Sequence, residues 1–302
     1  MCSKNSKTMN ITITGSLGNI GRHLVPQLTA AGHHVTVVTS NAERSAAIEQ
    51  AGAKAAVGSV TDADFLTRSF TGADAVFAMT PPNMGGSDII AGTVAAGKAF
   101  AQAIGAANVK RVVMLSSIGA DKAGGNGPIA GLHQIEGLYG QLKDVNVTFL
   151  RAGYFYTNSH NDIPLIKTAG IVGANYPAST LIPFVHPKDI AASAAEALVQ
   201  PGNGKDVQYI VSDLRSADDY ARLIGAAIGK PELPWVQFTD EQSMGGMTQA
   251  GLPEEIAALY TEMGAGLRNG SIQQHFNDSG KPLQGATKLE AYAQEFASHF
   301  SA

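Results

Sequence analysis

Residues 11–21 read ITITGSLGNIG, an apolar run followed by glycines at Gly15, Gly18 and Gly21. Gly15 permits a sharp turn after a strand, Gly18 lets the backbone approach a diphosphate without a Cβ in the way, and Gly21 lets the next helix lie close to the sheet. The N–H groups of the turn and the positive end of the helix then face the phosphates. A purely structural turn is the alternative. If a dinucleotide binds, we expect the turn to hold it through Gly15, Ser16, Leu17, Gly18, Asn19 and Ile20.

Short β-branched runs alternate with helix-like segments over the first 150 residues. The runs predict strands at 10–14, 34–39, 54–57, 73–79, 111–116 and 145–151. Segments with a helical spacing of apolar residues lie between them, at 20–31, 42–51, 62–70, 87–106 and 129–142. Nearly continuous apolar strands separated by helices indicate a parallel sheet that is buried on both faces. Because such crossovers are right-handed, we expect a doubly wound α/β layer of the Rossmann type.

The second half of the chain shows a weaker pattern. Residues 153–187 hold several prolines, glycines and aromatics with little regular period. A strand at 207–211 and helices at 188–199, 217–228, 253–263 and 288–300 are expected after them. We therefore predict three parts: an N-terminal tail (1–9), a Rossmann domain (10–152) and a smaller, mixed and mainly helical substrate region (153–302). The last part is expected to return partly to the main sheet and to form a lid over the strand ends.

The composition excludes several classes of protein. The chain has 302 residues, 44% of them hydrophobic, and a net charge of −4, which is typical of a folded protein rather than a disordered one. Acidic residues outnumber basic ones by 25 to 21, so direct nucleic-acid binding is not expected. Cys2 is the single cysteine and the eight histidines lack ligand spacing, so we expect no disulfide framework and no metal site. The N-terminus is polar and no apolar stretch of about 18 residues stands out, so we expect a soluble cytoplasmic protein, monomeric or homodimeric, without membrane contact.

The end of the second strand bears on which dinucleotide binds. An Asp or Glu there would bind the adenosine 2′-hydroxyl and favour NAD. The sequence instead has Thr39, Ser40 and Asn41, followed by Arg44, which can pair with a 2′-phosphate. The alternative is that Asn41 caps the next helix and Arg44 pairs with a neighbouring glutamate. We favour NADP(H) over NAD(H), because a repelling carboxylate is absent from the terminal position.

Three motifs together carry a family resemblance: the glycine turn, Ser116-Ser117-Ile118-Gly119-Ala120, and the run LRAGYFYTN at 150–158. Over about residues 9–230 the chain resembles the NmrA-like branch of the atypical short-chain dehydrogenases/reductases. The resemblance implies a Rossmann domain with a smaller C-terminal substrate region. Members of that branch include NAD(P)H-dependent quinone and azo reductases, phenylpropanoid reductases and redox-sensing regulators. The chain departs from the family pattern at Ser40, where Arg is common, at Ala152, where Pro is common, and at Ser59, where Asp is common.

Two sets of residues are candidates for catalysis. Short-chain reductases use Ser, Tyr and Lys, and this chain has Tyr139 and Lys143 four residues apart, with Ser117 upstream. Lys143 lies only eight residues before Arg151, however, so a structural role at the helix end is the alternative. The resemblance implies instead that His133 faces the nicotinamide, where it would donate a proton or orient substrate. A helix cap or a hydrogen bond to a neighbouring glutamate is the alternative role for His133.

The expected pocket lies where the strands end, since open α/β sheets bind ligands at that edge. Ser116 ends the fifth strand, and Met79, Thr80 and Pro81 follow the fourth, so all four are expected to contact the cofactor. The substrate is expected to lie against Pro82, His133, Tyr154, Phe155 and Asn158, whose aromatic members suit a planar acceptor. Ordinary core packing under the lid is the alternative for the aromatic residues.

Two functions from different classes fit these observations. The first is an NADPH-dependent oxidoreductase acting on a small planar electrophile such as a quinone or an azo compound, because such acceptors need little proton assistance. The second is a non-catalytic, NADP(H)-sensing regulator of the NmrA type, which the lack of a well-placed Tyr–Lys pair favours. A sugar-nucleotide epimerase or dehydratase is the third and weakest reading, because it needs that pair.

Overall fold

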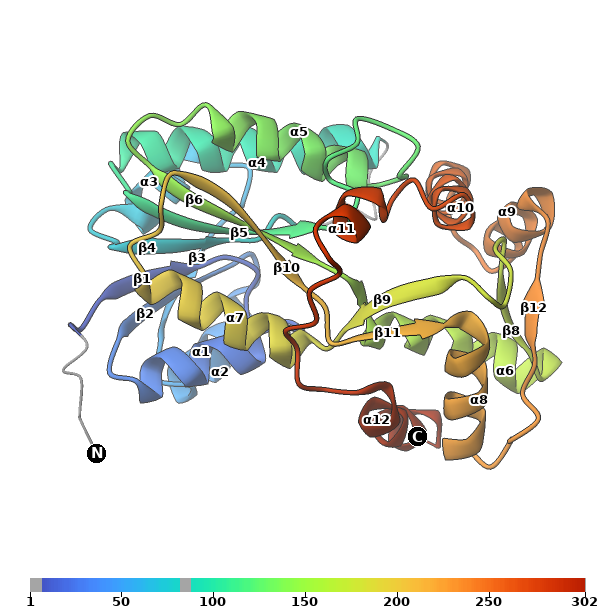
Figure 1. Cartoon of the computed structure of the whole chain (residues 1–302). Coiled ribbons are helices and arrows are strands. Elements are labelled where there is room, and N and C mark those ends of the chain that lie inside the picture. Colours follow the sequence, from blue (N-terminus) through green and yellow to red (C-terminus); the bar gives the residue numbers. More distant parts are fainter. Residues whose placement is uncertain (1–6, 82–87, 302) are drawn as a thin grey trace.

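The computed structural model describes residues 7–81 and 88–301. Its main sheet has seven strands, all parallel, in the order β10-β6-β5-β4-β1-β2-β3 (Figure 1). They are β1 (Asn10–Ile13), β2 (His34–Thr39), β3 (Lys54–Val57), β4 (Ala75–Ala78), β5 (Arg111–Ser117), β6 (Asn146–Ala152) and β10 (Lys205–Ile210). The chain order reverses between β1 and β4, which is the position where sheets of this kind bind their ligands. The expected doubly wound parallel sheet is confirmed.

Helices cover both faces of this sheet, as a buried parallel sheet requires. One face carries α1 (Gly21–Ala30), α2 (Ser45–Gln50) and α7 (Pro187–Val199). The other face carries α3 (Ala63–Phe70), α4 (Ile89–Ala106) and α5 (Ile129–Gly140). Each layer is sealed by fully buried apolar side chains, such as Leu24 and Ile190 on the first face and Phe70 and Phe100 on the second.

The remaining elements form a smaller part, to the right of the main sheet in Figure 1. Its strands are β7 (Tyr154–Phe155), β8 (Val172–Ala174), β9 (Leu181–Val185), β11 (Asp213–Ser216) and β12 (Trp235–Gln237). Its helices are the 3-10 helix η2 (Tyr156–Asp162), α6 (Ile163–Ala169), α8 (Ala217–Ala227), α9 (Asp240–Gln249), α10 (Glu254–Arg268), α11 (Gln274–Asp278) and α12 (Leu289–Phe300). Stacked aromatic rings hold this part together, with Tyr156 lying between Phe184 and Tyr292 at centroid distances of 5.3 and 4.8 Å.

The first half of the chain follows the expected boundaries closely. In the second half the expected helices at 188–199, 217–228, 253–263 and 288–300 and the expected strand at 207–211 are found as α7, α8, α10, α12 and β10, whereas several other elements there were not expected. The expected helix 42–51 begins as a 3-10 turn, η1 (Ala42–Arg44), before α2. Residues 153–187, expected to show little regular period, contain β7, η2, α6, β8 and β9. Helix α7 and strand β10 rejoin the main layer, where α7 packs beside α1 and β10 extends the sheet from β6.

Helix α4 is long and apolar enough to cross a membrane by length and composition, with a mean hydropathy of 1.3, which the sequence analysis did not anticipate. Half of its residues, however, are buried inside the protein, among them Val94, Phe100 and Ile104. The hydropathy of α4 is therefore that of a core helix, whose apolar residues pack on the sheet and on its neighbours α3 and α5.

Candidate functional site

The turn after β1 has a backbone that requires glycine. Gly15 has φ +95°, and Ser16 also lies in the left-handed region at φ 57°. A Cβ on Gly21 would lie 1.9 Å from the carbonyl oxygen of Ser16, so the chain crosses itself too closely for any side chain there. The hydroxyl of Thr14 bonds with the backbone of Met79, at 2.8 Å from its N–H, which ties the turn to the end of β4. Glycines at these positions therefore serve a tight turn and a close approach.

The same turn presents hydrogen-bond donors. Within the part of the chain that the structure describes, the N–H groups of Leu17, Gly18 and Asn19 have no protein acceptor. The Oγ of Ser16 is buried and likewise has no partner there. Helix α1 starts at once, with no side-chain cap and no acidic residue in its first turn. Several N–H donors at a positive helix end match the chemistry of a diphosphate, so the residues present fit a dinucleotide.

At the end of β2 the structure separates the two alternatives for the neighbouring side chains. Asn41 caps η1, with its Oδ1 accepting from the N–H of Glu43 at 2.9 Å, as one alternative expected. Arg44 is exposed and forms no ion pair within the described residues, so the expected pairing with a glutamate is not seen. Ser40 is exposed, whereas the hydroxyl of Thr39 is buried beside the backbone of Asn41. Arg44 and Ser40 thus remain available to a ligand.

A cavity of about 310 Å³ opens beyond the carboxyl ends of β5 and β6. Its described walls come from the ends of β5 and β6, from β7, η2 and β9, from the N-terminal parts of α4 and α5, and from α10. They consist of Thr80, Ile89, Thr93, Leu115, Ser116, Ser117, Ile118, Pro128, Ile129, Leu132, Ala152, Gly153, Tyr154, Phe155, Asn158, Ile182, Pro183, Ile256, Leu259, Tyr260, Met263, Leu267, Ile272 and Gln273. None of these described residues is an Asp, Glu, Lys, Arg or His. The cavity is therefore suited to an uncharged ligand.

Tyr154, Phe155, Asn158, Thr80 and Ser116 lie in this cavity lining, where the sequence analysis expected a ligand. Ile256, Leu259 and Tyr260 of α10 belong to it as well, and the sequence did not point to them because only a lid in general was expected. Their signal is the apolar face of a helix that begins after Pro253. A larger groove of about 780 Å³ lies at the amino ends of the strands, against β1 and β2, away from the glycine turn.

The residues after β4 form the bridge from the glycine turn to the cavity. The side chain of Met79 covers Gly15, since a Cβ on that glycine would meet the Met79 Cε at 1.8 Å. Thr80 lines the cavity and Pro81 is exposed. Pro82, also expected at the substrate, lies outside the described residues.

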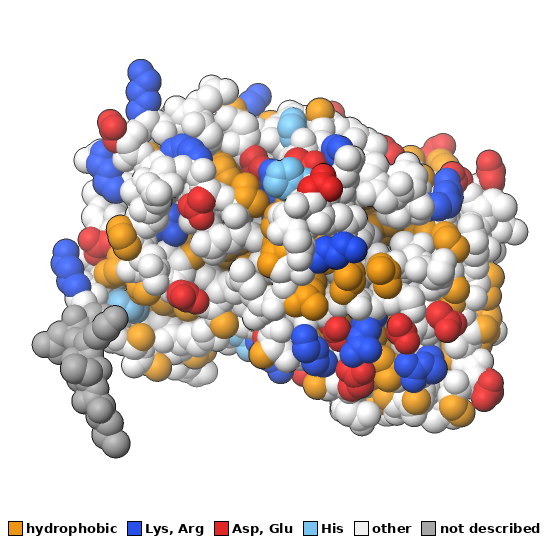
Figure 2. All heavy atoms as spheres, in the orientation of Figure 1, with side chains coloured by type: hydrophobic (Ala, Val, Ile, Leu, Met, Phe, Trp, Pro, Cys, Tyr) orange, Lys and Arg blue, Asp and Glu red, His pale blue; other side chains and the backbone are white. Residues whose placement is uncertain are grey.

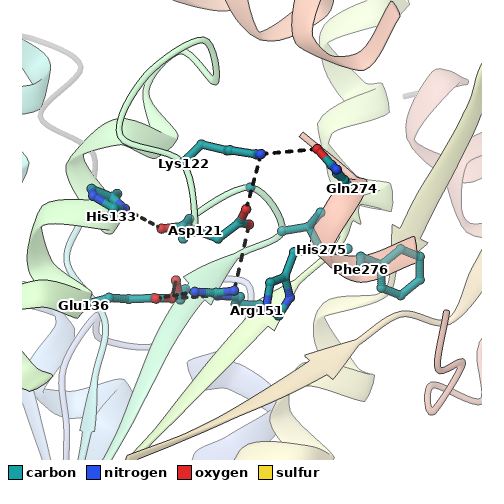
Figure 3. A network of polar contacts seen from close by, with 12 residues as sticks. Asp121, Lys122, His133, Glu136, Arg151, Gln274, His275 and Phe276 are labelled. Carbon is teal, nitrogen blue, oxygen red and sulfur yellow. Dashed lines mark hydrogen bonds and ion pairs between the residues drawn. The ribbon is translucent and has the colours of Figure 1, made fainter. Parts of the chain in front are cut away.

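Beneath the cavity, Glu136 of α5 and Arg151 of β6 form a buried ion pair (Figure 3). Arg151 donates through Nε to Oε1 of Glu136 at 3.0 Å and through a terminal nitrogen to Oε2 at 2.7 Å. Burial lowers the pKa of Arg151, but the hydrogen bonds and charge of Glu136 outweigh it and raise the pKa overall. The Oγ of Ser116 donates to the same Glu136 at 2.6 Å. The pair thus connects α5 and β6 to the cavity wall.

The network continues away from the cavity. Asp121 lies 3.8 Å from a terminal nitrogen of Arg151 and 4.0 Å from Lys122. Tyr209 of β10 contacts both Arg151 and His275 of α11 through its hydroxyl. This network was not expected from the sequence, although Arg151, a charged residue inside an apolar strand, was a signal that a buried partner must exist.

His133 is not among the described residues that line the cavity. Its Nδ1 hydrogen-bonds the carbonyl of Ala120 at 2.8 Å, which holds the ring against the loop after β5 (Figure 3). Leu132, the preceding residue of α5, faces the cavity instead. The geometry therefore gives no support for His133 as a proton donor or as a substrate contact.

The Tyr139–Lys143 pair lies away from the cavity. Tyr139 is fully buried in the core under the sheet, where burial raises the pKa of its hydroxyl, and that hydroxyl has no partner in the described chain. Lys143 is exposed in the turn that precedes β6, at the amino end of the strand. Helix α5 runs antiparallel to the strands, so its last turn points away from the ligand edge. The pair is therefore withdrawn as a catalytic candidate, and Ser117 has no tyrosine–lysine partner.

Asp162, behind the aromatic wall, has a perturbed carboxyl group. Burial raises the pKa of Asp162 to about 6, while the hydrogen bond from Tyr220 at 2.6 Å acts in the opposite direction. Above pH 6 the folded protein must bury this charge, whereas below about pH 4 the carboxyl is protonated in the folded and unfolded states alike. The stability that depends on Asp162 is therefore lost as the pH rises through about 6.

We expect Asp162→Asn to raise the free energy of unfolding at pH 8 by about 1–3 kcal/mol, because the amide keeps an acceptor for Tyr220 and carries no charge. At pH 3.5 the substitution should have little effect. Urea denaturation at both pH values measures the difference, and Asp278→Asn at an exposed position is the control. An equal effect of Asp162→Asn at the two pH values would contradict the expectation.

A family model described as NAD(P)H-binding matches residues 15–201. No curated protein matches the sequence significantly. A similar solved structure is the NADPH-dependent quinone oxidoreductase QOR2 of Escherichia coli in complex with NADPH, with a TM-score of 0.79 and 19% identity over 97% of this chain and 100% of that one. The triphenylmethane reductase of a Citrobacter species in complex with NADP(H) has a TM-score of 0.78 and 19% identity, covering 95% of this chain and 99% of that one.

A mutant form of the protein NmrA also shares the fold, with a TM-score of 0.73 and 18% identity over 97% of this chain and 96% of that one. The expected resemblance in fold to the NmrA-like branch is thus confirmed. At these identities the likeness is one of fold, so the chemistry has to be argued from the site.

Proposed function

Because this chain belongs to the NAD(P)H-binding family, we propose that it is an oxidoreductase that prefers NADP(H) to NAD(H). Its substrate is a small, planar, uncharged electrophile such as a quinone or an azo compound. The observation that carries the proposal is the cavity beyond the ends of β5 and β6, whose described walls hold no charged residue and no histidine. A carboxylate, a phosphate or a sugar nucleotide would be buried there without a partner, at a cost of several kcal/mol.

The glycine turn binds the cofactor and the cavity binds the acceptor. Leu17, Gly18 and Asn19 donate their N–H groups to the diphosphate, and Met79 and Thr80 lead from the turn to the cavity. When bound, the cofactor supplies the hydride. The apolar walls exclude water and pack against the planar acceptor. Quinones and azo compounds accept hydride with little acid assistance, so the lack of a Tyr–Lys pair is no obstacle.

Tyr154 in the cavity wall provides a hydrogen-bond donor for the reduced product. Burial raises the pKa of Tyr154 well above its ordinary value, and the nearby carboxyl group of Asp162 raises it further. Its hydroxyl is therefore protonated at neutral pH and donates a hydrogen bond to a developing oxyanion.

Turnover with paired acceptors tests the proposal. We expect the purified chain to oxidise NADPH, followed by its absorbance, with 1,4-naphthoquinone. The 2-sulfonate of the same quinone should have a kcat/KM lower by on the order of 100-fold, because its charge has no partner among the described residues of the cavity. Equal turnover of the two acceptors would contradict an uncharged site, and tight NADPH binding without turnover of any quinone, azo dye or aldehyde would contradict the enzyme.

The cofactor preference gives a separate prediction. Arg44→Ala should weaken NADPH binding roughly tenfold and leave NADH binding unchanged, since a charge-assisted hydrogen bond to the 2′-phosphate contributes about 1.5–3 kcal/mol. Dissociation constants from calorimetry measure both. Arg68→Ala, which removes another exposed arginine, is the control. A loss of affinity for both cofactors alike would contradict a role at the 2′-phosphate.

A non-catalytic NADP(H)-sensing regulator of the NmrA type is the second candidate. The absence of Asp, Glu, Lys, Arg and His from the described cavity walls favours it, and the fold is shared with NmrA. Such a protein would bind NADP(H) tightly and turn over none of the acceptors.

The proposal includes a small-molecule partner, a monomer or homodimer and a cytoplasmic location, with no direct nucleic-acid binding and no membrane contact. On the face that Figure 2 shows, basic and acidic side chains are interspersed rather than gathered by sign. This face therefore has no continuous basic patch to which the phosphate backbone of a nucleic acid could bind.

A further inference from the structure

Ser116 is the buried hydroxyl at the end of β5 and forms part of the cavity wall. Its Oγ lies 2.6 Å from Oε1 of Glu136. Glu136 is held as an acceptor, because Arg151 donates to both of its oxygens, at 3.0 and 2.7 Å. A carboxylate paired in this way has no proton to give, so the hydrogen of this bond belongs to Ser116.

A hydroxyl has one hydrogen, and Ser116 donates its hydrogen to Glu136. What Ser116 offers to the cavity is therefore a lone pair. Its neighbour Ser117 is similar, since its Oγ donates to the carbonyl of Ile118 at 3.0 Å. The end of β5 is thus an acceptor pair, which cannot stabilise a negative charge that develops on a substrate oxygen.

We propose that Ser116 accepts a hydrogen bond from the carboxamide N–H of the nicotinamide, and that Glu136 and Arg151 are the positioning pair that keeps it an acceptor. This inference rests on the proposed function, because it assumes that a nicotinamide dinucleotide binds. A dinucleotide that starts at the glycine turn and passes Met79 and Thr80 reaches the end of β5 next, because β4 and β5 are neighbours in the sheet. The carboxamide is the group of the nicotinamide ring that carries N–H donors.

Cofactor analogues test the bond without any substrate. The thionicotinamide analogue of NADP⁺ keeps the NH₂ group, whereas the 3-acetylpyridine analogue replaces it by a methyl group. We expect the chain to bind the first roughly tenfold more tightly than the second by calorimetry, the usual effect of leaving a buried acceptor unpaired. In Ser116→Ala, which leaves the Glu136–Arg151 pair intact, this ratio should fall to about one.

Ser212→Ala is the matched control. Ser212 is also buried and donates to a carboxylate, Asp189, at 2.6 Å, but it is not part of the cavity lining. The tenfold ratio should survive in this variant. An unchanged ratio in Ser116→Ala, or an equal loss of affinity for both analogues, as a bond from a ribose hydroxyl would produce, overturns the assignment. Failure of the unaltered chain to bind any form of the cofactor is a different result, and it overturns the proposed function itself.

The positioning role of Glu136 and Arg151 is tested with a variant that does not leave one buried charge without its partner. E136M/R151M removes both charges together, which proteins tolerate far better than the loss of one partner. With the pair gone, Ser116 is free to turn its hydrogen towards the cavity, and the ratio should fall towards one while circular dichroism shows a folded chain. A ratio that stays tenfold in folded E136M/R151M overturns the positioning role and leaves the Ser116 bond standing.

Discussion

Gly18→Asp is expected to weaken NADPH binding by on the order of 100-fold while the protein remains folded. A Cβ at Gly18 would meet its nearest neighbour, the carbonyl oxygen of Gly15, at 3.3 Å, which requires only a small adjustment. The new carboxylate, however, would occupy the side of the turn where Leu17, Gly18 and Asn19 present their N–H groups. Repulsion between a carboxylate and a diphosphate a few ångströms apart amounts to about 1–4 kcal/mol near a protein surface.

Calorimetric titration with NADPH measures this loss, and thermal unfolding checks the fold. Gly124→Asp places the same charge on an exposed loop glycine that has no close neighbours, and it should bind NADPH as the unaltered chain does. If Gly18→Asp bound NADPH with unchanged affinity, the turn would be structural only.

Arg151→Met is expected to lower the free energy of unfolding by about 3–5 kcal/mol, because it leaves the carboxylate of Glu136 buried without its partner. The side chains of the two residues are only 7% and 10% exposed, so water cannot take the place of the guanidinium. For a chain of this size the change corresponds to a fall in Tm of roughly 10 °C.

An exposed ion pair provides the comparison. Arg222 pairs with Asp219 at 3.1 Å, with side chains 58% and 39% exposed, so Arg222→Met should cost less than about 1 kcal/mol. E136M/R151M should recover most of the stability that Arg151→Met loses. Equal effects of Arg151→Met and Arg222→Met in urea denaturation would show that the buried pair has no special role.

The sheet was predictable because its signals are local. Strands such as β2 and β3 are short apolar runs between turn residues, and their ends agree with the expected boundaries at 34–39 and 54–57. The glycine spacing after β1 is a local signal because the positive φ of Gly15 and the close backbone contact at Gly21 require glycine. Strands β8 and β9 escaped prediction because Gly173 and Pro183 interrupt their apolar runs, and both residue types are depleted in strands.

The candidate site was predictable by region and less so by residue. Ser116, Tyr154 and Asn158 lie at the cavity because they follow strands that end at the ligand edge. The sequence does not show which face of α5 meets the cavity. Leu132 lines the cavity, and the next residue, His133, is not among its described lining residues. One residue on a helix is about 100° of rotation, which is enough to move a side chain from a cavity to a loop.

Tyr139 failed as a candidate for a related reason. It lies seven residues beyond Leu132 on α5, which is about 10 Å further along the helix axis and away from the ligand edge. The importance of Glu136 and Arg151 depends on contact between a helix and the following strand, which spacing along the chain does not reveal. The one sequence signal of this ion pair is Arg151, a charged residue within the apolar run of β6.

Calorimetric titration of the purified chain with NADPH, NADP⁺, NADH and NAD⁺ shows whether the turn after β1 binds a dinucleotide. We expect saturable binding at one site per chain, with NADPH and NADP⁺ binding more tightly than NADH and NAD⁺. No heat of binding with any of the four dinucleotides would contradict this expectation.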